Sequence, residues 1–112
     1  MAFLLVVALP AWALSPEARE FMNITEELEP VHCEKRKLRR SLALAEIERR
    51  DAEAKELRAR FSALDRDPKT ARLEKRLAEL ERRMSNGKGG TRDPEDLEAI
   101  SVHQRAAYHR CG

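Results

Sequence analysis

A run from residue 31 to residue 64 contains neither glycine nor proline, and this constrains the fold more than any other feature. Glycine and proline interrupt helices, whereas the alanine, leucine, glutamate, lysine and arginine that fill the run favour them. Charges of opposite sign at i,i+4 spacing, such as Glu46 with Arg50, add local support. The run therefore predicts one uninterrupted helix about 50 Å long.

The apolar positions of this long helix form two stripes that are offset around its axis. One stripe consists of Leu38, Leu42 and Ala45, and the other runs from Ile47 through Ala54 to Leu64. A helix with two offset stripes is expected to contact different partners along its two halves. We interpret part of the second stripe as a candidate interaction surface, made of Ile47, Leu57, Phe61 and Leu64.

Three helix starts in the rest of the chain share one pattern, a serine or aspartate followed by proline and an acidic or basic residue. Such a residue caps the helix N-terminus, and proline suits the first helical position. Pro30 separates the first of these helices from the long one, and a glycine-rich segment over residues 85–90 separates the last two. The expected helices cover residues 16–29, 68–84 and 94–110.

The fold class that follows is all-α. The link over residues 65–67 is short, and short links favour antiparallel neighbours. We expect an antiparallel helical hairpin of coiled-coil type, with helix 31–64 packed against a broken second arm of 68–84 plus 94–110. Charged residues make up 38% of the chain and aromatic residues 4%, which suits a thin seam between helices better than a layered core.

Residues 1–13 are typical of an export signal. Residues 2–9 are all apolar, Pro10 ends the run, and Ala11-Trp12-Ala13 matches the small-x-small pattern of a signal-peptidase site. The apolar run is short and no basic residue precedes it. A start codon placed too far downstream would explain both features. The run is also too short to span a bilayer as a helix. We expect a signal peptide over 1–13, a short helix within 14–30, a hairpin over 31–112 and a periplasmic or secreted location. The alternative is a buried or interfacial N-terminal helix.

The two cysteines, Cys33 and Cys111, are expected to meet. If the chain ascends the long helix and descends through both shorter ones, each about 26 Å long, Cys111 arrives level with Cys33. If helix 94–110 turned back, the cysteines would lie tens of ångströms apart, beyond the roughly 7 Å that a disulfide allows between Cα atoms. An exported chain can keep a disulfide, and a loop of this length gives about 4.5 kcal/mol in the chain-entropy model. A link between two chains and free thiols are the alternatives.

A metal site at the same place is a second hypothesis. The pairing would bring His32, Cys33, His109 and Cys111 together, which is a zinc-like ligand set. Residues one or two positions apart on a helix point in different directions, which disfavours the site. We therefore expect no cofactor, and a metal-binding or metal-stress protein stays an alternative function.

The charge pattern bears on other partners. The chain has 22 basic and 20 acidic residues, closely interleaved, which does not suit a nucleic-acid binder. The densest basic run covers residues 35–40. We expect this run to form a solvated helix face that does not contact a membrane, and peripheral binding of an anionic membrane surface through it is a further alternative.

Catalysis finds no support in the sequence. The serines lie in helical or glycine-rich surroundings without a nucleophile elbow, and no glycine-rich loop joins a strand to a helix. The carboxylates lie at ion-pair spacing on surface faces. We expect a structural or protein-interaction module, not an enzyme, whose partner is another protein or a second copy of the chain and which takes no small-molecule substrate.

Overall fold

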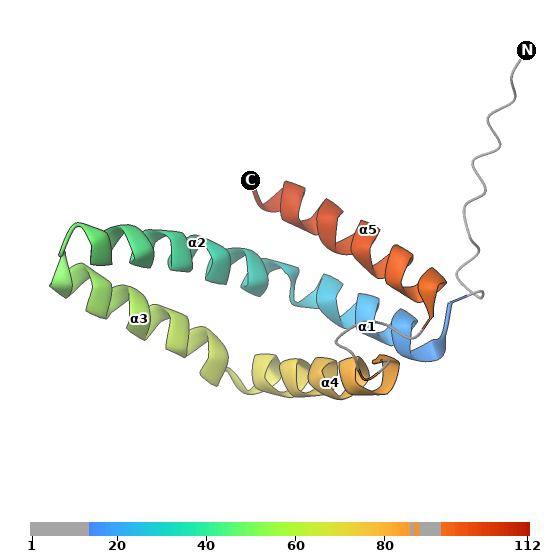
Figure 1. Ribbon diagram of the computed structural model, residues 1–112. Coiled ribbons are helices and arrows are strands. Elements are labelled where there is room, and N and C mark those ends of the chain that lie inside the picture. The colour runs from blue at the N-terminus through green and yellow to red at the C-terminus, as the bar shows by residue number, and fades with distance from the viewer. Residues whose placement is uncertain (1–13, 86, 88–92) are drawn as a thin grey trace, which may run out of the picture.

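The computed structural model of the chain describes residues 14–85, 87 and 93–112. The regular elements of this part are five helices: α1 (Pro16–Glu27), α2 (Glu29–Ile47), α3 (Asp51–Arg66), α4 (Pro68–Met84) and α5 (Pro94–Cys111) (Figure 1). The predicted all-α class is confirmed. The predicted signal peptide lies outside the described residues, as do residues 86 and 88–92 of the glycine-rich segment.

The three predicted cap-and-proline starts are helix N-termini in the structure. The Ser15 hydroxyl accepts a hydrogen bond from a backbone N–H of α1 at 3.1 Å, and Asp93 accepts one from α5 at 2.9 Å. At α4, the Asp67 carboxylate accepts from the N–H of Thr70 at 3.0 Å, and this bond holds the pKa of Asp67 below its ordinary value. The side chains satisfy N–H groups that the helices themselves leave unpaired.

The single helix predicted over residues 31–64 is wrong, because the chain reverses direction at residues 48–50. There α2 ends and α3 begins, and the two helices lie antiparallel (Figure 1). The charges follow this geometry: Glu46 pairs with Arg58 across the turn at 3.2 Å, and Arg50 pairs with Glu48 at 2.8 Å. The i,i+4 pairing of Glu46 with Arg50 that the sequence suggested is replaced by these contacts.

Backbone hydrogen bonds define the turn between α2 and α3. The N–H of Arg50 donates to the carbonyl of Ala45 at 2.8 Å, and the N–H of Arg49 donates to that of Glu46 at 3.2 Å. This pair of bonds is the Schellman arrangement, which places one residue in the left-handed region. That residue is Arg49, with φ 56°, where glycine is usual. The turn therefore lacks the residue by which such turns are recognised in a sequence.

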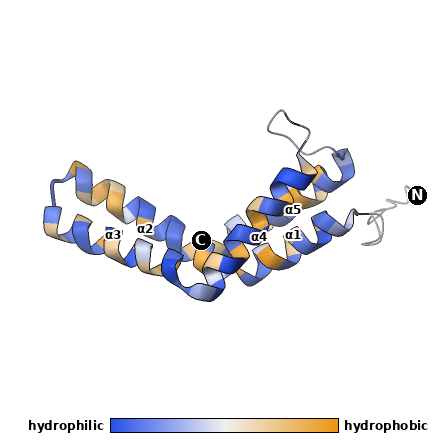
Figure 2. Ribbon diagram, turned by 90° about the horizontal axis from the view of Figure 1, so that it is seen from below, coloured by the Kyte–Doolittle hydropathy of each residue, from blue (hydrophilic) through white to orange (hydrophobic). Residues whose placement is uncertain are grey.

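The reversal predicted at residues 65–67 is also wrong. Only Asp67 separates α3 from α4, and α4 leads onward from α3 at a bend instead of folding back along it (Figures 1 and 2). At the other side of the molecule, α1 leads directly into α2 through Leu28, whose N–H still donates to Ile24 at 2.9 Å. The chain thus forms one arm from α1 and α2 and a returning arm from α3 and α4. The last helix, α5, then runs back alongside α1.

Two separate apolar clusters hold these helices together. We call α1, α4 and α5 the three-helix end, and α2 with α3 the two-helix arm. Figure 2 shows hydrophobic stretches gathered where the three helices meet. The core of the three-helix end consists of Leu14, Ala18, Phe21, Ile24, Leu28, Leu77, Leu80, Met84 and Ile100. The core of the two-helix arm consists of Leu38, Ala45, Ala54 and Leu57, with Leu42, Phe61 and Leu64 packed against it.

The second cluster changes the interpretation of the predicted interaction surface. Leu57 is 6% exposed, and Phe61 and Leu64 pack with it against α2. These three residues therefore line the interior of the two-helix arm, because the turn folds the second stripe onto the first. Ile47, at the end of α2, is 80% exposed and remains on the surface.

Candidate functional site

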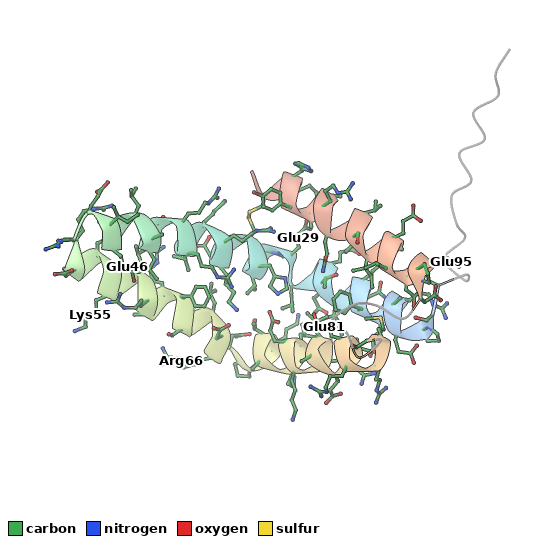
Figure 3. All side chains as sticks on the ribbon, viewed as in Figure 1. Glu29, Glu46, Lys55, Arg66, Glu81 and Glu95 are labelled. Carbon is green, nitrogen blue, oxygen red and sulfur yellow. A yellow bond between two sulfur atoms is a disulfide. The ribbon has the colours of Figure 1, made fainter. Side chains whose placement is uncertain are left out.

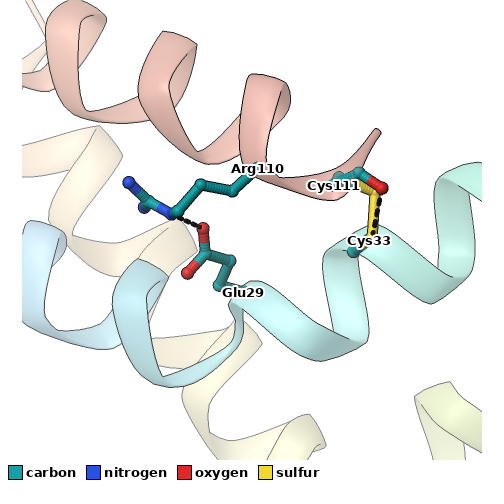
Figure 4. The surroundings of a disulfide bond; sticks show 4 residues. All are labelled: Glu29, Cys33, Arg110 and Cys111. Carbon is teal, nitrogen blue, oxygen red and sulfur yellow. Dashed lines mark hydrogen bonds and ion pairs between the residues drawn. A yellow bond between two sulfur atoms is a disulfide. The ribbon is translucent and has the colours of Figure 1, made fainter.

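Cys33 and Cys111 are joined by a disulfide, with their Cα atoms 5.5 Å apart (Figure 4). The predicted pair is therefore present, but the predicted route to it is wrong. Since the reversal comes at residues 48–50, the two returning helices end beyond the start of α2. The last helix must turn back to reach Cys33, and α5 does so. The disulfide fastens the C-terminal end of α5 to the first turns of α2.

Further contacts fix the same end of α5. Arg110 donates to the Glu29 carboxylate at 2.7 Å, as Figure 4 shows. The Arg36 guanidinium lies over the ring of Tyr108, 5.1 Å from its centre. A cation over an aromatic face is attracted by the ring's quadrupole. The covalent link is thus supported by an ion pair and a cation–π contact.

The opposite end of α5 is tied to the start of α1. The Ser15 backbone N–H donates to Asp96 Oδ1 at 3.0 Å, and its hydroxyl donates to Oδ2 at 2.5 Å. Asp96 is 2% exposed. Contacts at both of its ends therefore hold α5 in place against α1 and α2.

A groove runs between α4 and α5. Each of these helices packs against α1, but the two make few contacts with each other. Two adjoining hollows of about 540 and 570 Å³ occupy the space between them and share Phe21, Ala78, Glu81 and Gln104 in their linings. Phe21, Leu77 and Ile100 give the groove an apolar floor. Short side chains, Ala78 on α4 and Ser101 on α5, leave it open.

The walls of the groove carry charges. His32 and Glu74 meet at its edge, with Nε2 and Oε1 2.6 Å apart. Glu81 on α4 and Arg105 on α5 also line it, and neither forms an ion pair with any residue in the described part of the chain. Figure 3 shows Glu81 on the side of α4 that faces the other two helices of this end. The α4 wall thus offers a free acid and the α5 wall a free base.

Ion pairs fix the position of the α4 wall relative to α1. Arg76 donates through Nε and Nη2 to the two carboxylate oxygens of Glu20, the shortest distance being 2.7 Å. This hydrogen bonding holds the pKa of Glu20 below its ordinary value and raises the pKa of Arg76. Lys69 pairs with Glu27 at 2.7 Å nearer the start of α4. A bidentate guanidinium–carboxylate pair constrains geometry more than a single contact does.

The residues considered for a metal site are not brought together as a set. His32 faces Glu74, the two cysteines are bonded to each other, and His109 lies edge-on to Tyr108 with ring centres 5.8 Å apart. Among the described residues, no group of three or more histidine, cysteine, aspartate and glutamate side chains is placed to hold a metal ion.

The basic run over residues 35–40 is partly engaged within the chain. Lys35 pairs with Asp65, and its amine lies 5.0 Å from the centre of the Phe61 ring. Arg39 lies over the same ring at 5.2 Å. Lys37 and Arg40 stay exposed. Within residues 14–85, 87 and 93–112, none of the helices has the length and hydropathy to cross a membrane.

The groove is the feature that the sequence did not indicate. Its signal would have been that the apolar face of α5 is longer than the single residue Ile100 that the core of the three-helix end takes from it. Leu97 is 46% exposed and Tyr108 60%, and both line the groove. Comparison of the chain with protein families, curated proteins and solved structures finds no match. The groove and its charges are therefore the features of the molecule that bear on its function.

Proposed function

We propose that this protein is exported and acts as a non-enzymatic interaction module, whose groove between α4 and α5 receives a helix of a partner protein. The observation that carries the proposal is the groove itself, with its apolar floor and charged walls. Helical partners commonly bind by laying an apolar face into such a groove. A guest helix would convert the three-helix end into a four-helix arrangement.

The dimensions favour a helix with small side chains at the contact. Helices pack with their axes 8–10 Å apart, and the closest approaches require small residues. Ala78 and Ser101 provide such positions on the two walls, while Leu97 and Tyr108 supply exposed apolar surface at the two ends of the α5 wall. An amphipathic helix with an alanine-rich stripe meets this surface best.

Charge complementarity specifies the guest further. Glu81 on one wall and Arg105 on the other favour a helix with a basic residue toward α4 and an acidic residue toward α5. Charges arranged in this way chiefly set orientation and partner choice. A guest helix with the reversed arrangement would place like charges together and would be rejected.

Export is supported by two independent features. Residues 2–9 are apolar, and small residues precede Leu14 at the spacing of a signal-peptidase site. The Cys33–Cys111 disulfide suits an oxidising compartment. The two features together support the proposed periplasmic or secreted location, and cell fractionation with intact-mass measurement of the recovered protein tests it.

The groove is tested by site-specific photo-crosslinking in the host cell. A photoreactive amino acid at Ala78 should crosslink to a partner, whereas the same residue at Ala59, exposed on α3, should not. The crosslinked peptide should map to an amphipathic helix with the charge arrangement given above. A crosslink to a second copy of the chain, or equal crosslinking at both positions, would overturn the proposal.

A substitution series sharpens the same test. Ala78→Arg fills the groove at an exposed position and should abolish the crosslink from a probe at Gln104, whereas Ala59→Arg should leave it unchanged. Glu81→Lys should weaken the crosslink at least about tenfold, because it places a cation against the guest's basic residue. Retention of full crosslinking in both groove variants would contradict the assignment.

A further inference from the structure

Asp96 is a buried carboxylate that lacks a cationic partner. It is 2% exposed and accepts two hydrogen bonds, both from Ser15. Among the residues that the structure describes, no basic side chain forms an ion pair with it. Carboxylates are almost never fully buried without a positive partner, because removal of the charge from water is unfavourable. Ser15 supplies hydrogen bonds but no charge.

The space beside Asp96 favours a cation. A cavity of about 430 Å³ opens there between the start of α1, the end of α4 and the start of α5. Its lining includes the carboxylates of Glu17, Asp93 and Asp96, and Arg83 is the basic residue among them. The lining is therefore net negative. A small ammonium group would gain Coulomb energy there, and the low exposure of Asp96 would limit screening.

Leu14 places one particular nitrogen atom beside this cavity. Its side chain is 8% exposed and belongs to the core of the three-helix end, so the residue is fixed in position. Its nitrogen is three covalent bonds from the Ser15 nitrogen, a separation of at most about 4 Å. Since the Ser15 nitrogen lies 3.0 Å from Asp96 Oδ1, the Leu14 nitrogen lies within about 7 Å of that carboxylate.

We infer that hydrolysis of the Ala13–Leu14 bond creates the missing cation, and that the new α-ammonium group of Leu14 pairs with Asp96. This inference rests on the proposed export, which supplies the peptidase. Water adds across the amide: Ala13 leaves as a carboxylate, and the Leu14 nitrogen takes up the protons to become an ammonium group. At neutral pH an α-amino group with an ordinary pKa near 8 is largely charged.

The burial of the Leu14 side chain and the position of the Asp96 carboxylate together favour cleavage at the Ala13–Leu14 bond. Cleavage one residue later would remove the Leu14 side chain from the apolar cluster. Cleavage earlier would leave extra residues and move the ammonium group away from Asp96. Processing and folding are thereby linked, because the mature N-terminus completes the contact between α1 and α5.

The test compares two purified proteins with the disulfide formed, one starting at Leu14 and one at Ala13. Both are released from a fusion by a protease that leaves no added residue, and both carry a free amino group. At pH 6 the Leu14 protein should unfold about 5 °C higher, a shift typical of one added ion pair in a domain of this size. In the Asp96→Asn background, where the Ser15 hydrogen bonds can persist, the difference should vanish.

Acetylation confined to the α-amine, carried out near neutral pH where the lysine amines stay protonated, gives an independent readout should Asp96→Asn fail to fold. It should lower the melting temperature of the Leu14 protein by a similar amount and leave the Ala13 protein unchanged. Equal melting temperatures of the two proteins would overturn the pairing. Sequencing of the protein recovered from its host should begin at Leu14, and any other first residue in an exported protein would overturn the processing site. Recovery of the unprocessed chain from the cytoplasm would instead overturn export itself, while the melting comparison would still report on the pairing.

Discussion

The three-helix end and the two-helix arm solve the same packing problem with different resources. The three-helix end surrounds large side chains from several directions, so that Leu80 is 0% exposed. The two-helix arm has a single seam, and two of its most buried residues are Ala45 at 0% and Ala54 at 3%. The larger Leu42, Phe61 and Leu64 of this seam are only partly buried, because two helices leave the sides of the seam open to water.

The two-helix arm covers its larger apolar residues with charged side chains instead. Phe61 is flanked by Lys35 and Arg39, whose cationic groups lie over its ring. Long basic side chains can cover apolar surface with their methylene groups while their charges stay in water. Lys35 and Arg39 of the basic run thus contribute to the packing of the arm. In the two-helix arm, charged side chains cover apolar surface that a third helix covers in the three-helix end. A high density of charged residues can therefore accompany an arm that has few helices.

The largest expected effect comes from removal of the disulfide. Cys33→Ser with Cys111→Ser should lower the free energy of unfolding by about 4 kcal/mol, because the bond closes a loop with a sequence separation of 78 residues. The loss should be local as well as global. Hydrogen exchange should accelerate first in α5, while the α2–α3 turn keeps its protection. Equal acceleration of hydrogen exchange in α5 and in the α2–α3 turn would show that the disulfide stabilises both regions alike.

A matched pair of cavity substitutions compares the two cores directly. Leu80→Ala in the three-helix end should cost about 4 kcal/mol, and Leu57→Ala in the two-helix arm about 2 kcal/mol. The larger value reflects the enclosure of Leu80, which is 0% exposed among three helices, whereas Leu57, 6% exposed, packs in a seam between only two. Urea unfolding of both variants measures the difference. A larger loss for Leu57→Ala would reverse the proposed ranking of the cores.

The turn of the two-helix arm offers a smaller, stabilising change. Arg49→Gly should raise the free energy of unfolding by about 1 kcal/mol, because glycine adopts a positive φ without steric penalty. Arg49→Ala serves as the control and should give no gain, since alanine carries the same Cβ atom. If both variants gained equally, removal of the arginine charge would be the cause.

The smallest expected effect is the acid dependence of the three-helix end. The Arg76 hydrogen bonds hold the pKa of Glu20 below its ordinary value of 4.5 in the folded state. Their contribution to stability is therefore complete above pH 4.5 and is lost as the pH falls through the lower folded pKa. Glu20→Gln should flatten the fall in melting temperature below pH 4.5. The control Glu98→Gln, on the exposed side of α5, should not.

Local signals in the sequence predicted local structure well. The serine- and aspartate-proline pairs located the starts of α1, α4 and α5, because capping depends on a few adjacent residues. The turn at residues 48–50 was missed because Arg49 occupies the position where glycine would have announced it. The offset between the two apolar stripes did indicate the turn, because the two stripes face each other once α3 folds back on α2.

Long-range features were predicted unevenly. The cysteine pair was found because chain lengths allow few ways for Cys33 and Cys111 to meet, although the path proposed between them was wrong. The groove could not be found in this way. It exists because Ala78 and Ser101 are short at the place where α4 and α5 diverge, and that divergence depends on how both helices sit on α1.

The bond between Cys33 and Cys111 also determines how the molecule would carry mechanical load. A pull applied at Gly112 passes through the sulfur atoms directly into α2, so that everything between residues 33 and 111 is shielded from extension. From Leu14 onward, only the segment up to residue 32 could be extended, to a total length of at most about 65 Å. Tension applied between the two ends of the chain would therefore extend α1 first, and the two-helix arm would carry no load.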